Sequence, residues 1–150
     1  MPVLVLGADS PLGRELCLGL LAAGGQVRAY CQYEPEGLRS LGVFVALGGP
    51  VDVPRLEAAL TGVHTLIHLT GRDVRRHSEE EEALEVTSIS AHAAEIPRVV
   101  VAIAEDAPAR TRRAVDAGLV HTEGCDFETI VVAYTADAAV ATILAADSRA

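Results

Sequence analysis

The stretch Val3-Leu4-Val5-Leu6-Gly7-Ala8-Asp9-Ser10-Pro11-Leu12-Gly13 decides the fold of this 150-residue chain. Its four leading apolar residues predict a buried strand, and the helix-like segment that follows runs from Arg14 to Ala23. Gly7 and Gly13 fill the first and third glycine positions of a turn that cradles a pyrophosphate. The first glycine permits the tight bend, and the third lets the helix pack closely on the strand. The stretch therefore predicts a dinucleotide-binding strand, turn and helix.

Two residues of this turn depart from the pattern. Ser10 stands in the middle glycine position, so a Cβ and a hydroxyl are expected where bare backbone should meet the ligand. Pro11 supplies no N–H to the first helical turn, which faces the anion. Two alternatives stay open at this point: the turn binds a nucleotide, or it has become purely structural.

The composition excludes several classes of function. The chain is 50% hydrophobic and 22% charged, which is enough apolar material for one core, so we expect a single domain over residues 1–150. The net charge is −9, and the 12 basic residues, all arginine, are scattered, so we predict no nucleic-acid partner. No stretch approaches the roughly 18 apolar residues of a membrane span, and none has the form of a signal peptide.

The cysteines and histidines predict no metal site. Cys17, Cys31 and Cys125 lie far apart, which fits neither a zinc site nor a disulfide framework. Cys31 falls on a predicted buried strand, where an inert thiol is the ordinary finding. We expect a reduced protein in the cytoplasm.

Short apolar runs alternate with longer amphipathic segments along the whole chain. Their continuous hydrophobicity predicts parallel strands buried on both faces, at Val3–Leu6, Val27–Cys31, Val43–Leu47, Thr65–Leu69, Val99–Ala104 and Phe127–Ala133. Helices are expected between them. Ser78, three residues before Glu81, predicts a capping box, and the acidic run 79–82 is interpreted as a solvated helix start.

Several segments in this order resemble the atypical or extended short-chain dehydrogenase/reductase group, especially its NmrA-like branch. The resemblance covers nearly all of the chain and rests on the phosphate turn, residues 42–48, residues 56–71 with their H-x-x-G ending, residues 97–101 and residues 124–130. It implies a doubly wound Rossmann fold, with a six-stranded parallel sheet in the order 3-2-1-4-5-6 and helices on both faces.

The resemblance also implies where a cofactor would bind. The turn from Gly7 to Gly13 would hold the phosphates, and the ribose would lie near the expected set Gln32, Leu69, Thr70 and Gly71. Gln32 replaces the charged residue that usually ends the second strand, and Asp9 would repel an additional phosphate. We therefore expect NAD(H) in preference to NADP(H), with the loss of cofactor binding as the alternative.

The usual chemistry of the family is not expected. Its tyrosine, whose hydroxyl exchanges a proton with substrate, is paired with a lysine four residues later. This chain has no lysine, and the matching helix over residues 108–120 has no tyrosine. The chain also stops one helix after the sixth strand, where extended members continue into a substrate lobe. The leading hypothesis is a non-catalytic, NmrA-like dinucleotide-binding protein with a sensing or regulatory role.

Two other functions remain open from the sequence. An NAD(P)-dependent oxidoreductase or sugar-nucleotide epimerase would need a nonstandard acid or base, for which His68 and Tyr134 are the candidates. The alternative for His68 is a strand-end histidine bonded to nearby backbone, and for Tyr134 a residue that covers the sheet edge. The third hypothesis is an interaction module that has lost its ligand and binds a second copy or another protein.

Overall fold

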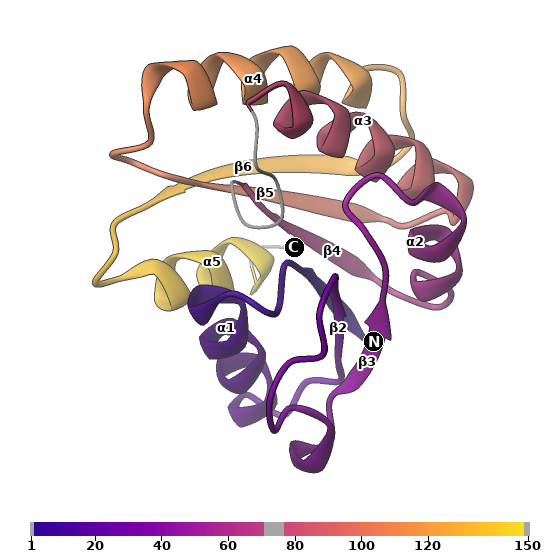
Figure 1. Ribbon diagram of the computed structural model, residues 1–150, viewed down its shortest axis with the longest axis vertical. Helices are drawn as coiled ribbons and strands as arrows, with labels where there is room; N and C mark the ends of the chain where they lie inside the picture. The colour runs from indigo at the N-terminus through magenta and orange to yellow at the C-terminus, as the bar shows by residue number, and fades with distance from the viewer. Residues whose placement is uncertain (1, 71–76, 149–150) are drawn as a thin grey trace.

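The computed structural model describes residues 2–70 and 77–148. Six parallel strands form one sheet in the order β3-β2-β1-β4-β5-β6 (Figure 1). The order confirms the doubly wound Rossmann fold expected from the sequence. The chain reverses direction across the sheet between β1 and β4, and in such folds ligands bind outside the carboxyl ends of the strands at this point.

The strands and helices alternate along the chain. The strands are β1 Val3–Leu6, β2 Val27–Cys31, β3 Phe44–Leu47, β4 Thr65–Leu69, β5 Arg98–Ala104 and β6 Glu128–Tyr134. The α-helices are α1 Pro11–Ala22, α2 Val53–Ala59, α3 His77–Ala93, α4 Ala109–Leu119 and α5 Ala139–Ser148, with short 3₁₀ turns at Arg39–Leu41 and Val120–Thr122. No helix in the part of the chain that the structure describes is long and apolar enough to cross a membrane.

The helices form two layers, one on each face of the sheet. Helices α1 and α5 pack together below the sheet in Figure 1, and α2, α3 and α4 cover the other face. Two apolar cores result, because successive strand residues point to opposite faces. On β4, Ile67 and Leu69 enter the core under α1 and α5, whereas Leu66 enters the core under α2 to α4.

The prediction that all six strands are buried on both faces is wrong for the two outer strands. Phe44 and Leu47 on β3 are 62% and 39% exposed, and Val131 on β6 is 50% exposed. The reason is topological, since β3 and β6 have a neighbouring strand on one side only. The four inner strands are buried as expected, apart from the half-buried Arg28 of β2 and Ala104 at the end of β5.

The acidic run at the start of α3 differs from the expectation of a solvated segment. Glu81 and Glu82 are exposed, but Glu80 is only 2% exposed. Helix α3 already includes His77, so Ser78 is not its N-cap, and the Ser78 side chain lies outside what the structure describes. Glu80 is buried because the turn of α3 that carries it packs onto β4. Its carboxylate lies beside the ring of His68 there.

Candidate nucleotide-binding site

The turn between β1 and α1 has the backbone geometry that its outer glycines predict. Gly7 has a φ of 89°, which side-chain-bearing residues rarely adopt, and its N–H donates to the Tyr30 carbonyl at 2.9 Å. A Cβ on Gly13 would lie 2.3 Å from the Gly7 carbonyl oxygen and 2.7 Å from the Ala8 Cα. Helix α1 therefore approaches the turn as closely as backbone allows, which brings its N-terminus to the carboxyl edge of the sheet.

The Ser10 side chain makes two hydrogen bonds within the turn. Its Oγ donates to the Gly7 carbonyl at 2.8 Å and accepts from the Gly13 N–H at 3.0 Å. The residue is the N-cap of α1, with an extended backbone, and Pro11 follows in the first helical position. Local capping bonds hold the hydroxyl against the backbone, and Ser10 also lines the hollow beside the turn.

The capping bonds determine which N–H groups of the turn remain for an anion. Pro11 has none, Gly13 donates to the Ser10 hydroxyl, and Arg14 donates to the Ser10 carbonyl. The N–H of Leu12 has no acceptor among the described residues, while its side chain is buried in the core. Leu12 is thus the first-turn residue of α1 whose N–H is open to a phosphate oxygen.

A hollow of about 650 Å³ borders the turn. Its walls are the turn and the loop after β2, and it is lined by Ala8, Asp9, Ser10, Pro11, Arg14, Pro35, Glu36 and Gly37. Two contacts join these walls: an Asp9 carboxylate oxygen accepts from the Tyr33 N–H at 3.4 Å, and the Arg14 guanidinium donates to the Glu36 carbonyl. Two acidic side chains and one arginine therefore line the hollow, and backbone contacts already hold Asp9 and Arg14.

The other expected cofactor residues have different environments. Gln32 is exposed directly after β2, whereas Leu69 is buried in the core. Thr70 is buried, and both its N–H and its hydroxyl donate to the Ala102 carbonyl, at 3.1 and 2.9 Å. Thr70 therefore ties the end of β4 to β5, and both of its hydrogen-bond donors are used in this contact. Gly71 lies outside the described residues.

His68 is turned into the protein rather than toward the sheet edge. Its ring is 1% exposed and lies on the face covered by α3. Nδ1 is 2.9 Å from the Thr87 hydroxyl, and Nε2 is 3.4 Å from a carboxylate oxygen of Glu80, which is also buried. The partners are side chains of α3, not the neighbouring backbone that the sequence suggested. Both ring nitrogens therefore face side chains of α3.

Tyr134 ends β6, on the same edge as the turn but far along it. It is 4% exposed and packs in the core under α1 and α5. Strands β4 and β5 lie between β1 and β6, so at about 4.8 Å per strand Tyr134 is roughly 14 Å from the turn. The structure does not bring the two predicted acid–base candidates together.

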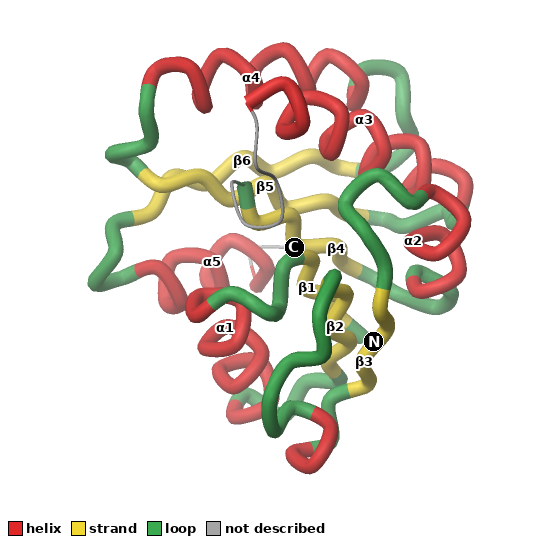
Figure 2. Tube along the Cα trace, in the orientation of Figure 1, coloured by secondary structure: helices red, strands yellow, loops and turns green. Residues whose placement is uncertain are grey.

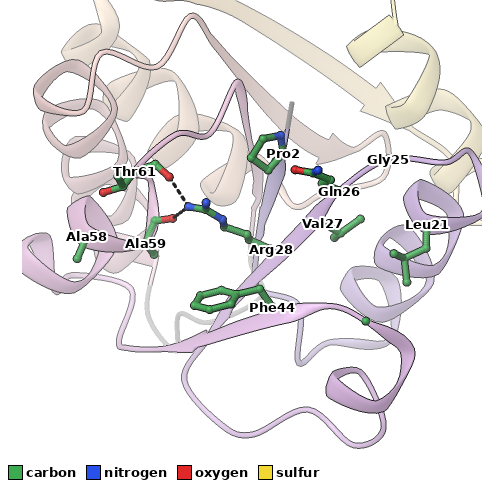
Figure 3. Close-up of a pocket in the computed structure, with 11 residues that line it drawn as sticks. Pro2, Leu21, Gly25, Gln26, Val27, Arg28, Phe44, Ala58, Ala59 and Thr61 are labelled. Atoms are coloured by element: carbon green, nitrogen blue, oxygen red, sulfur yellow. Dashed lines mark hydrogen bonds between the residues drawn. The ribbon is translucent and has the colours of Figure 1, made fainter.

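A second hollow, of about 500 Å³, lies at the opposite edge of the sheet, beside the start of β2 and β3 (Figure 3). Arg28 crosses it, donates to the Ala59 carbonyl at 2.9 Å and to the Thr61 carbonyl, and lies 5.8 Å from the ring centroid of Phe44. The guanidinium thus holds the carbonyl end of α2, where a cation is favoured. Arg28 is therefore a structural residue. The hollow lies at the amino ends of the strands, whereas ligands of this fold bind at the carboxyl ends.

The remaining reactive side chains form no site. Among the described residues, no group of three or more His, Cys, Asp or Glu side chains is placed to hold a metal ion. Cys17 and Cys31 are buried in the core under α1 and α5, and burial raises the pKa of Cys17 to about 12. The Cys17 thiol is therefore a poor nucleophile, and Cys31 lies on a buried strand as predicted.

Known structures share this arrangement of strands and helices at low sequence identity. The NADP(H) complex of triphenylmethane reductase from Citrobacter sp. matches with a TM-score of 0.77 and 17% identity over 87% of this chain and 48% of that one. A short-chain dehydrogenase/reductase superfamily protein from Agrobacterium tumefaciens with bound NAD matches with a TM-score of 0.69 and 19% identity, over 87% and 48% of the two chains. This is the fold of the short-chain dehydrogenases/reductases.

A nucleoside-diphosphate-sugar epimerase from Staphylococcus aureus has the same fold, with a TM-score of 0.74 and 14% identity over 89% of this chain and 50% of the epimerase. The chain spans about half the length of these structures. No family model and no curated protein matches its sequence.

Two residues important to the site were missed by sequence reasoning. Tyr30, on β2, donates its hydroxyl proton to the Gly49 carbonyl at 2.9 Å and fills the space where a Cβ on Gly48 would lie, 2.2 Å from the Tyr30 oxygen. Arg14 closes one wall of the hollow beside the turn. The pair Gly48-Gly49 was a signal of close approach in this short-chain dehydrogenase/reductase fold, but its partner is 18 residues away in sequence.

Proposed function

We propose that this chain binds a nicotinamide dinucleotide at the carboxyl edge of its sheet, with the β1–α1 turn against the pyrophosphate. The close approach of Gly13 to Gly7 and Ala8 carries the proposal, since it sets the N-terminus of α1 at the point where the strand order reverses. The Leu12 N–H and the positive end of α1 would face the phosphates, and the adjoining hollow and Gln32 would receive the adenosine ribose.

The preferred dinucleotide is NAD(H) rather than NADP(H). An additional phosphate in the hollow would meet the carboxylates of Asp9 and Glu36, while the single arginine there, Arg14, is already bonded to the Glu36 carbonyl. At the effective dielectric of a protein surface, two like charges about 4 Å apart repel by about 4 kcal/mol. We expect this repulsion to exceed the attraction of Arg14, because its guanidinium already donates to the Glu36 carbonyl.

The role that we propose is non-catalytic, as a sensor or carrier of the dinucleotide of the NmrA-like kind. Three observations support it: the chain contains no lysine, α4 contains no tyrosine, and His68 is buried between β4 and α3 with both ring nitrogens engaged. A redox enzyme that uses His68 as its acid is disfavoured by the same contacts. The expected location is the cytoplasm.

A thermal-shift titration with NAD, NADH, NADP and NADPH tests the proposal. A ligand at a hundred times its dissociation constant adds about 2.7 kcal/mol to the free energy of unfolding. We expect a saturable rise in Tm with NAD or NADH and a smaller rise with the phosphorylated pair. The absence of a shift with all four nucleotides would contradict dinucleotide binding.

The variant Asp9→Asn tests the selectivity separately. It removes a negative charge from the hollow but keeps an oxygen that can accept from the Tyr33 N–H. We expect it to strengthen NADP binding and to leave NAD binding nearly unchanged. The matched control is Glu15→Gln, an exposed carboxylate of α1 that does not line the hollow. Equal gains in both variants would assign the effect to net charge rather than to Asp9.

Catalysis is tested by following the absorbance of the reduced nicotinamide in the presence of carbonyl and sugar-nucleotide substrates. We expect no turnover. Measurable turnover that is lost in His68→Leu would contradict the non-catalytic role and restore His68 as an acid or base.

A further inference from the structure

The outer side of β3 is an open edge with an unusual concentration of apolar side chains. Eight large hydrophobic side chains are exposed among the described residues, and five of them lie between residues 33 and 51: Tyr33, Leu41, Phe44, Leu47 and Val51. Strand β3 ends the sheet on this side (Figure 2). The apolar surface and the open edge therefore coincide.

This edge has few of the devices that usually protect an outer strand. Proteins place charged residues, proline or a bulge on exposed edges to prevent pairing with another chain. Residues 41–49 contain no charged side chain and no proline, and β3 pairs with β2 without a bulge. Two charged side chains lie nearby: Arg28 lies beside the Phe44 ring and is bonded to the end of α2 (Figure 3), and Arg55 of α2 is bonded to the Leu47 carbonyl.

The direction of the backbone groups along β3 follows from its pairing with β2. The Gly48 N–H donates to the Cys31 carbonyl, so the even-numbered residues of β3 point toward β2. Because alternate residues of a strand point to opposite sides, the N–H and C=O groups of Val45 and Leu47 point outward. The Val43 N–H is already bonded to the Leu38 carbonyl, and the Leu47 carbonyl accepts from the Arg55 guanidinium at 3.3 Å.

We propose that two copies of this chain associate through their β3 edges, as antiparallel strands about a twofold axis at Val45. In this register the two Val45 residues exchange both of their N–H···O bonds, and each Leu47 N–H donates to the Val43 carbonyl of the other copy. In this register the Val43 N–H and the Leu47 carbonyl form no hydrogen bond between the copies. Each copy already provides partners for these two groups, the Leu38 carbonyl and the Arg55 guanidinium. The strand is thus complementary to itself.

The side chains agree with this register. On the face covered by α2, Phe44 would lie opposite the small Ala46 of the second copy, and on the other face Leu47 would lie opposite Val43. Every opposed pair is apolar, and a large side chain meets a smaller one in each unlike pair. A twofold contact of this kind is closed, so it gives a dimer and not a filament.

The first test is the mass of the full 150-residue chain in solution, measured by light scattering across a dilution series. We expect twice the monomer mass of 15.7 kDa at the higher concentrations. A monomer at every concentration would overturn the proposal. The test does not depend on nucleotide, so it can fail while dinucleotide binding stands, and the reverse also holds.

The variant Leu47→Pro tests the edge itself. It removes an N–H that the monomer does not use, at the end of an outer strand where proline is tolerated. Its matched control is Val131→Pro on the other open edge, because Glu128 donates to the Pro97 carbonyl and the odd-numbered residues of β6 therefore point outward. We expect a monomer for Leu47→Pro and a dimer for Val131→Pro. The opposite result would place the interface on β6.

Hydrogen exchange on the unmodified chain keeps the proposal testable if a proline variant fails to fold. Among the residues that the structure describes, the outward amides of Val45 and Leu47 have no acceptor in a single copy, and neither has that of Val131. We expect slow exchange at Val45 and Leu47 and fast exchange at Val131. Fast exchange at all three amides under conditions where the mass is that of a dimer would show that the copies meet elsewhere.

Discussion

The β1–α1 turn and the β4–α3 junction, by which we mean His68 and Thr70 at the end of β4 with Glu80 and Thr87 of α3, adjoin neighbouring central strands, but they use their polar groups differently. At the turn, close backbone packing and a capping serine leave the Leu12 N–H without a partner among the residues that the structure describes. At the junction, Thr70 bonds to β5, and His68 turns inward to Glu80 and Thr87. A position at the carboxyl edge therefore does not define a site, because the groups must also remain unpaired.

The largest effect is expected from Gly13→Ala, which disrupts the close backbone packing of the turn. The new Cβ would lie 2.3 Å from the Gly7 carbonyl oxygen, and backbone must move to admit it. We expect a loss of about 3 kcal/mol or more in the free energy of unfolding, together with loss of nucleotide binding. Urea unfolding measures the loss of stability. The control is Gly49→Ala, because a Cβ on Gly49 meets nothing within 4 Å. Equal effects at the two glycines would show that the turn is not closely packed.

The next effect tests the junction. His68→Leu leaves the buried Glu80 carboxylate without one of its partners, and we expect a loss of about 2 kcal/mol. The double variant with Glu80→Leu should lose less than the sum of the two single variants, because the polar pair is removed together. If instead the stability is unchanged and nucleotide affinity falls, His68 belongs to the ligand site and the contrast between the two regions fails.

A smaller effect separates the two roles assigned to Ser10. Ser10→Ala removes the cap of α1 and should cost about 1 kcal/mol, whereas Ser10→Gly should cost only a few tenths. Because the hydroxyl is directed into the turn, we expect both variants to bind NAD about as well as the original chain once stability is accounted for. A large gain in affinity for Ser10→Gly would show that the side chain obstructs the ligand.

The smallest effect concerns thiol reactivity. It compares the cysteines buried under α1 and α5 with the partly exposed Cys125. Cys125 is partly exposed, whereas Cys17 and Cys31 are buried and the pKa of Cys17 is raised to about 12. We expect one fast-reacting thiol in the native chain at neutral pH and three after denaturation. The variant Cys125→Ser should remove the fast phase, and a persisting fast phase would mean that the core under α1 and α5 opens readily.

The sequence predicted the order of elements well because apolar continuity and the outer glycines are local signals. All six strands lie within one or two residues of their expected bounds, and Gly7 and Gly13 have the close backbone geometry expected of them. The inward turn of His68 and the burial of Glu80 could not be predicted, since each depends on a partner 12 residues away across the packing of α3 on β4. The capping bonds of Ser10 were not predicted, because they are set by the path of the turn.

The exposure of β3 was missed, although the predicted strand order 3-2-1-4-5-6 already placed this strand at one end of the sheet. Residues 43–47 are as apolar as the central strands, so composition gave no sign that one side of this strand is open. Its position at the end of the sheet follows from the strand order, and the exposed Phe44 is the result.

A titration of the isotope-labelled chain with NAD, followed by its amide resonances, tests the central claim most directly. We expect saturable shifts at Ala8, Leu12 and Gly13 and in the loop of residues 32–37, with little change at Glu80 and Thr87 or around the hollow beside Phe44. Shifts confined to the junction or to that hollow, or no shift at any nucleotide concentration, would contradict the assignment of the β1–α1 turn as a dinucleotide site.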